Sequence, residues 1–255
     1  MRRVIAALCL AFAMSAQAST NTSEISDTWV TPGEGGWGVN IVLQNNVAFV
    51  SFFVYDTNRN PTWFIAVLNY APGYVWSGTL YADRGPYFGG PFDPATVVER
   101  TAGTASFTVH NLNQATLTYT MDGVTVTKSM ERLTFTIEDY TGSYAGGYSI
   151  RLSGCSPSSL NGINELAGLL SVTQTGTAFR LAATANATSC TFNGTYSQFG
   201  KLGDVVGTYT CADGTAGSFQ LIEMTPTISG FTARASGNNQ FCQWTGYMGG
   251  ISRAP

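Results

Sequence analysis

The chain has 255 residues, a formal net charge of −3, and only 11% charged side chains against 44% hydrophobic ones. It contains no basic run, so it lacks the electrostatic footprint of a protein that binds nucleic acid. Its 29 glycines and 13% aromatic residues are typical of β-structure with many turns, in which polar faces carry hydroxyls rather than charges.

The first 18 residues have the pattern of a secretory signal peptide. Arg2-Arg3 supply a positive start, and residues 4–14 form an apolar run that is too short to span a membrane. Ala16-Gln17-Ala18 then provides the small residues that a signal peptidase reads, which predicts cleavage before Ser19. We therefore expect an exported protein, periplasmic or extracellular, with no transmembrane segment after cleavage.

Strand patterns fill the first half of the remaining chain. Residues 37–44 alternate between the two faces of a half-buried strand, whereas residues 47–55 and 62–70 are apolar on both faces, which indicates a further covered surface. The long irregular stretch 83–95 is rich in Gly, Pro and aromatic residues, so we expect a lid, a binding loop or a plug there. Further strand candidates are residues 75–82, 105–110, 115–121 and 124–132.

A glycine-rich stretch at residues 140–147 separates a second run of strands. We expect two small antiparallel all-β domains, at residues 19–137 and 138–255. Each is predicted to be a barrel (up-and-down, lipocalin-like or avidin-like) or a sandwich. A single helical turn is expected within residues 160–170. The predicted strands of the second half are residues 148–152, 166–173, 177–185, 190–197, 205–211, 217–224, 230–235 and 241–248.

Four cysteines remain after the predicted loss of the signal peptide, and all lie in the second half. An even count in an exported chain favours disulfides. Folding the chain into a hairpin about Gly200-Lys201 places Cys190 opposite Cys211. The other pair, Cys155 with Cys242, would then join the first strand of the domain to its last, which favours a closed barrel over an open sheet.

An ordered set of anchor residues in the first half resembles a β-module common in secreted proteobacterial proteins. The resemblance spans roughly residues 28–135 and implies an exported β-domain, with no activity attached. Val30-Thr31 departs from the module's usual aromatic-Asn pair. The anchors are Trp29-x-x-Pro32-x-Glu34-x-Gly36-Trp37-Gly38, Gln44, Tyr55-Asp56, Pro61-x-Trp63, Tyr81-Ala82-Asp83-Arg84-Gly85, Phe88-Gly89, Phe92-Asp93-Pro94-Ala95 and Arg132-Leu133-Thr134.

Aromatic side chains are crowded into the first half, and they have two interpretations. They fill the interior of a small barrel, or they form a pocket or groove that stacks on sugars, peptides or small apolar molecules. The second interpretation predicts a ligand site at the irregular loop. Its candidate residues are Trp37, Trp63, Trp76, Tyr81, Arg84, Tyr87 and Phe88.

Catalytic and metal sites have little support in the sequence. His110 is the only histidine and falls on the polar face of its strand, so neither a catalytic triad nor a zinc site has its usual partners. Two of four loop carboxylates could formally serve as a catalytic acid–base pair, although such residues usually cap turns. The four are Glu34, Asp56, Asp83 and Asp93.

The sequence thus predicts a non-catalytic binding protein without a cofactor, whose ligand is a small molecule, a glycan or a protein. The alternative is a structural protein of the cell envelope or extracellular space. Binding predicts a cavity, whereas assembly predicts a filled interior and an exposed apolar sheet face.

Overall fold

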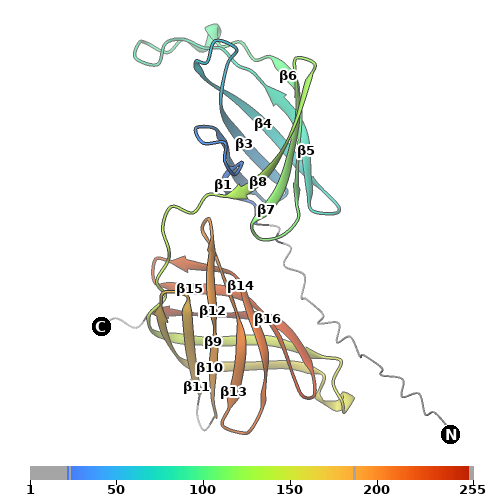
Figure 1. Ribbon diagram of the computed structural model, residues 1–255, viewed down its shortest axis with the longest axis vertical. Helices are drawn as coiled ribbons and strands as arrows, with labels where there is room; N and C mark the ends of the chain where they lie inside the picture. The colour runs from blue at the N-terminus through green and yellow to red at the C-terminus, as the bar shows by residue number, and fades with distance from the viewer. Residues whose placement is uncertain (1–21, 23, 186–187, 253–255) are drawn as a thin grey trace, which may run out of the picture.

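A computed structural model describes residues 22, 24–185 and 188–252. They form two closed antiparallel barrels of eight strands each, joined by the segment between β8 and β9 (Figure 1). Neighbouring strands follow one another along the chain in both barrels. The expected all-β fold is therefore confirmed, as barrels rather than sandwiches. The predicted signal peptide lies outside the described residues.

The first barrel contains the eight strands of the aromatic-rich half. Its closing pair, β1 with β8, is short and joins Trp29 to Arg132 and Val30 to Glu131. The irregular loop is partly ordered by a bridge between Arg84 and Val98 and by a 3-10 helix, η1 (Pro94–Thr96). The strands are β1 (Asp27–Val30), β2 (Gly38–Gln44), β3 (Val47–Tyr55), β4 (Pro61–Ala71), β5 (Val75–Tyr81), β6 (Thr101–Val109), β7 (Gln114–Met121) and β8 (Val124–Arg132).

Large side chains fill the interior of the first barrel. Trp29 packs edge-on against Phe107, with ring centroids 5.0 Å apart, and both side chains are fully buried. The outer face of β3 and β4 is also largely apolar, and Val42 of β2 lies beside it, but this face is exposed rather than covered. Its exposed apolar side chains include Val42, Phe49, Phe53, Trp63 and Val67.

The second barrel has longer strands and a longer closing pair. β9 and β16 pair from Tyr144↔Ser252 to Ser153↔Gln243. The prediction of a helical turn within residues 160–170 is wrong, because strand β10 begins at Gly162 and pairs with β9 over most of its length. A short 3-10 helix, η2 (Ser158–Leu160), lies just before that range and overlaps it only at Leu160. The strands are β9 (Gly142–Ser153), β10 (Gly162–Thr175), β11 (Ala178–Ala185), β12 (Thr188–Phe199), β13 (Leu202–Cys211), β14 (Ala216–Thr227), β15 (Gly230–Asn239) and β16 (Gln243–Ser252).

Both predicted disulfides of the second barrel are present. Cys190 bonds to Cys211 across the β12–β13 pair, and Cys155 bonds to Cys242 next to the β9–β16 closing pair. The predicted register is confirmed, since Phe192 faces Tyr209 two residue pairs inward from Cys190 and Cys211. The disulfides therefore fix the same end of the barrel from two sides.

The two barrels contact each other through the β12–β13 turn, which points toward the first barrel (Figure 1). The Gly200 N–H donates to Thr134 Oγ1 at 2.9 Å, and the Lys201 N–H donates to Asp27 Oδ2 at 3.0 Å. Leu112 of the first barrel packs with apolar residues of the second, which makes a small shared core. The other members of that core are Phe199, Leu202 and Ile222.

Candidate functional site

A cavity of about 470 Å³ opens in the half of the second barrel that lies away from the first barrel. The opposite half is filled by buried side chains such as Tyr144, Phe179 and Phe231. This volume falls in the range of about 300–1,000 Å³ that is usual for small-molecule sites. The apolar and aromatic lining residues are Tyr148, Ile150, Leu152, Leu166, Ala167, Ala185, Phe192, Tyr209, Trp244 and Met248.

Strand alternation explains why these side chains meet. Successive residues of a β-strand point to opposite sides, so every second residue of β9 and of β16 faces the interior. Tyr148 lies opposite Met248, and Leu152 lies opposite Trp244. The apolar lining is thus contributed by regular strands, whose backbone hydrogen bonds hold it in place.

Three aromatic rings of the cavity lining, together with the buried ring of Phe219 behind them, are ordered by contacts with one another. Phe192 stacks on Tyr209, with ring centroids 5.1 Å apart and an interplanar angle of 20°, and it meets Phe219 edge-on. Trp244 packs edge-on against Tyr209 at 6.0 Å, and its Nε1 donates to the Tyr209 hydroxyl at 3.3 Å. A ligand that enters would meet rings whose orientation is already set, which lowers the entropic cost of binding.

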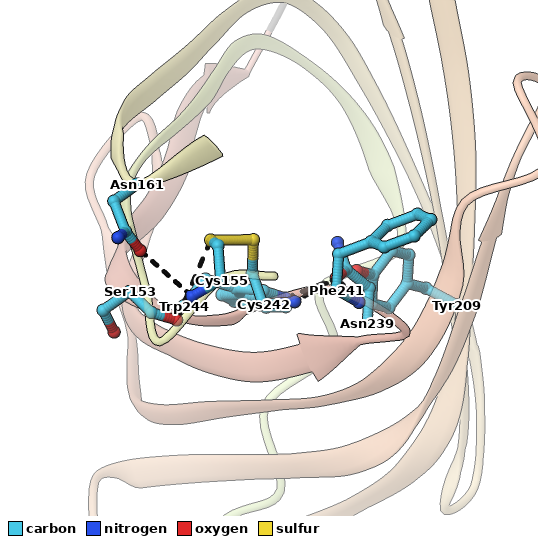
Figure 2. Close-up of a disulfide and its surroundings, with 8 residues drawn as sticks. All are labelled: Ser153, Cys155, Asn161, Tyr209, Asn239, Phe241, Cys242 and Trp244. Carbon is cyan, nitrogen blue, oxygen red and sulfur yellow. Dashed lines mark hydrogen bonds between the residues drawn. A yellow bond between two sulfur atoms is a disulfide. The ribbon is translucent and has the colours of Figure 1, made fainter. Parts of the chain in front are cut away.

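The two disulfides and two asparagines fix the rim. Asn161 Oδ1 accepts the Cys155 N–H at 3.0 Å, and Asn239 Oδ1 accepts the Cys242 N–H at 2.7 Å (Figure 2). Asn239 Oδ1 also accepts the N–H of Phe241 at 2.8 Å. These bonds tie the β9–β10 and β15–β16 connections to the bridge, so the rim is held both covalently and by hydrogen bonds.

The polar groups of the lining gather around the mouth. Asp213 in the β13–β14 turn accepts the N–H of Thr215 at 2.9 Å, and this hydrogen bond lowers the pKa of the carboxyl. Burial raises the pKa of Tyr148 and of Tyr209, so both phenols are neutral at physiological pH. The polar lining residues are Asn164, Glu165, Thr188, Asp213, Thr215 and Asn239.

Chemically, this arrangement suits the burial of an apolar group. Phenols and amides can accept or donate hydrogen bonds to one polar end of a ligand. The described residues include no group of three or more His, Cys, Asp or Glu side chains that could hold a metal ion.

The structure does not bring the candidate site residues of the first barrel into one cavity. Trp76 is buried inside the barrel, whereas Trp63 lies on the outer face and is 52% exposed. Trp37 is half-buried, and its Nε1 donates to Glu34 at 2.9 Å. Tyr81 is also half-buried, while Arg84, Tyr87 and Phe88 of the irregular loop are exposed. A binding role for these seven residues stays a prediction.

The loop carboxylates mostly serve local structure. Asp56 Oδ1 accepts the N–H groups of Asn58 and Asn60, and Asp93 caps η1 through the N–H of Ala95. Turn capping, the expected role for such residues, accounts for both.

Two further titratable residues of the first barrel have local roles. Glu34 pairs with Lys128 at 2.8 Å, and that contact lowers the pKa of Glu34. His110 is exposed and lies 2.7 Å from the Thr116 hydroxyl.

The sequence predicted a ligand site in the first half, where aromatic residues are most crowded, and so it did not indicate the cavity of the second barrel. A signal was present in the cysteine register, which already placed Phe192 opposite Tyr209 beside the Cys190–Cys211 pair. A cross-strand aromatic pair at one end of a barrel, next to a disulfide, indicates where an interior site can form.

Comparisons with known proteins leave the function open. No protein-family model, no curated protein and no solved structure matches the chain. Among the described residues, no helix is both long and apolar enough to cross a membrane.

Proposed function

We propose that the protein is an exported, non-catalytic binding protein that holds a small, largely apolar molecule, or the apolar end of a larger one, in the second barrel. The observation that carries this proposal is the 470 Å³ cavity lined by ordered aromatic side chains. Large pockets lined by aromatic side chains and by a few polar groups are the usual form of small-molecule sites. The two disulfides favour an oxidising compartment, in line with the signal-peptide pattern.

The experiment uses a fluorescent apolar probe, N-phenyl-1-naphthylamine, whose emission rises in an apolar environment. In the variant Ile150→Trp, a half-buried lining residue is replaced by a larger one that occupies part of the cavity. We expect probe binding to weaken by on the order of tenfold, because the probe and the new ring compete for one space.

Ile163→Trp is the matched control. Ile163 lies on the neighbouring strand β10, is 64% exposed, and does not line the cavity. It should leave probe binding unchanged. Equal probe affinity in the parent protein and in Ile150→Trp would place the binding elsewhere and remove the basis of the proposal.

A structural role is the second candidate, and the filled interior and exposed apolar face of the first barrel favour it. Self-association through that face predicts that Phe53→Ser with Trp63→Ser shifts the protein toward monomer in sedimentation velocity. The control Val206→Ser with Tyr247→Ser changes two exposed residues of the second barrel. A parent protein that is monomeric at high concentration would argue against self-assembly.

A further inference from the structure

The charged side chain that lines the interior of the cavity of the second barrel is acidic: it is Asp213, in the β13–β14 turn. Glu165 borders the cavity from the outer face of β10, because it pairs with Ser149 whereas the neighbouring Leu166 pairs with the lining residue Tyr148. Within the described part of the chain, neither carboxylate takes part in a salt bridge. On that outer face, Glu165 Oε1 accepts a hydrogen bond from the Ser149 hydroxyl at 2.8 Å.

The negative charge of Asp213 reaches the aromatic lining. Its carboxylate contributes to the raised pKa of both Tyr148 and Tyr209, after the larger effect of burial. No cationic side chain contributes to either pKa. The two phenols therefore lie in the cavity lining within reach of the negative charge of Asp213.

Aromatic rings in such a place attract cations. The faces of Trp and Tyr rings carry negative partial charge, and a cation within about 6 Å of the ring centre is attracted to it. Tyr209 and Trp244 meet edge to face, with ring centroids 6.0 Å apart, so they present surfaces in two directions. An anion would meet both the ring faces and the Asp213 carboxylate, and it would find no positive side chain in the lining.

We infer that the cavity selects cationic amphiphiles, molecules whose apolar body fills the barrel and whose amine or quaternary ammonium group lies at the Asp213 mouth. The inference rests on the proposed function and names the ligand class for that same cavity. The apolar body would contact Ile150, Leu166, Phe192 and Met248, while the cation would lie near Tyr148 and Tyr209.

Three probes that share the same apolar body and differ in their terminal group test this inference. They are 4-phenylbutyltrimethylammonium, 4-phenylbutan-1-ol and 4-phenylbutanoate, and binding is measured by isothermal titration calorimetry on the full mature chain. We expect the ammonium probe to bind on the order of tenfold or more tightly than the carboxylate, with the alcohol between them. Raising the salt concentration should weaken the ammonium probe and leave the alcohol unchanged, since salt screens only charged ligands.

The variant Asp213→Asn separates charge from shape. An asparagine oxygen can still accept the Thr215 N–H, so the turn is kept while its charge is lost. The preference for ammonium over carboxylate should shrink several-fold.

The matched control is Asp139→Asn. Asp139 is exposed and makes the same turn bond to the N–H of Thr141 at 2.9 Å, but it precedes β9 at the barrel end nearer the first barrel. This variant should keep the full preference.

The possible outcomes are distinct. Equal affinity for the three probes, tightest binding of the carboxylate, or an unchanged preference in Asp213→Asn overturns the charge selection and leaves the binding function standing. If none of the three probes binds, both the selection and the proposed function fail.

Discussion

Trp29 and Trp76 are both fully buried inside the first barrel, yet their indole nitrogens differ in environment. Trp29 Nε1 donates to the Ile25 carbonyl at 2.9 Å, and the Arg132 guanidinium lies 4.4 Å from the Trp29 ring centroid. Trp76 Nε1 has no hydrogen-bond partner among the described residues. Leaving a buried N–H without a partner costs about 1–3 kcal/mol, so Trp76 stabilises the barrel less than its buried area alone would indicate.

This difference predicts unequal effects of one substitution at the two sites. Trp→Phe removes the same ring volume at either position, but only Trp29→Phe also removes a hydrogen bond and weakens a cation–π contact. We expect Trp29→Phe to lower the free energy of unfolding by about 2 kcal/mol more than Trp76→Phe does. Urea unfolding followed by far-UV circular dichroism measures both. Equal losses would show that the two indole nitrogens contribute alike.

Arg132, which lies over the Trp29 ring, is a buried charged residue of the first barrel. Its side chain is fully buried, pairs with Asp27 at 3.0 Å, and donates to the Leu112 carbonyl at 2.6 Å. Burial lowers the pKa of Arg132, and the Asp27 carboxylate opposes that shift. A buried guanidinium is tolerated here because an opposite charge and backbone carbonyls replace the water that it loses.

At the scale of strands, the sequence predicted the features that depend on neighbouring residues. The hairpin register of β12 and β13 followed from pairing like with like, so Cys190 was correctly placed against Cys211. The second bridge then required β9 to lie beside β16, and this closure is present. Strand alternation and turn residues depend only on neighbouring positions, and for that reason the sequence predicted the strand register correctly.

The location of the cavity could not be predicted in the same way. Whether a barrel is filled depends on the summed side-chain volume that eight strands place at each level, and that sum depends on the stagger between strands. β4 is apolar on both faces, so its pattern did not show that Trp63 points outward while Ala66 and Leu68 point inward. Aromatic density alone therefore favoured the barrel that is filled.

At the scale of the whole molecule, one glycine turn of the second barrel lies directly against the first barrel. Gly200 has φ +57°, and a Cβ atom there would lie 2.1 Å from Asp27 Oδ2. Gly176, in the β10–β11 turn, has φ +59° with open space around it. The two turns thus have the same backbone conformation, and they differ in whether the other barrel lies against them.

Substitution by alanine should separate turn strain from contact between the barrels. Gly176→Ala and Gly200→Ala each place a side chain at positive φ, at a cost of about 1 kcal/mol. Only Gly200→Ala should also speed hydrogen exchange at the N–H groups of residues 200 and 201, because the new methyl group displaces Asp27. Peptide-resolved exchange mass spectrometry measures this effect. Unchanged exchange in Gly200→Ala would show that the turn does not hold the barrels together.

The bridge between Cys155 and Cys242 spans 87 positions of the chain and has a consequence for covalent connectivity. Between these two cysteines the polypeptide is a ring rather than a line. A protease that cuts once inside the ring leaves both pieces bonded to each other, and a cut between Cys190 and Cys211 leaves them bonded twice. In the oxidising compartment that we propose, a nicked second barrel would therefore remain one molecule until its disulfides were reduced.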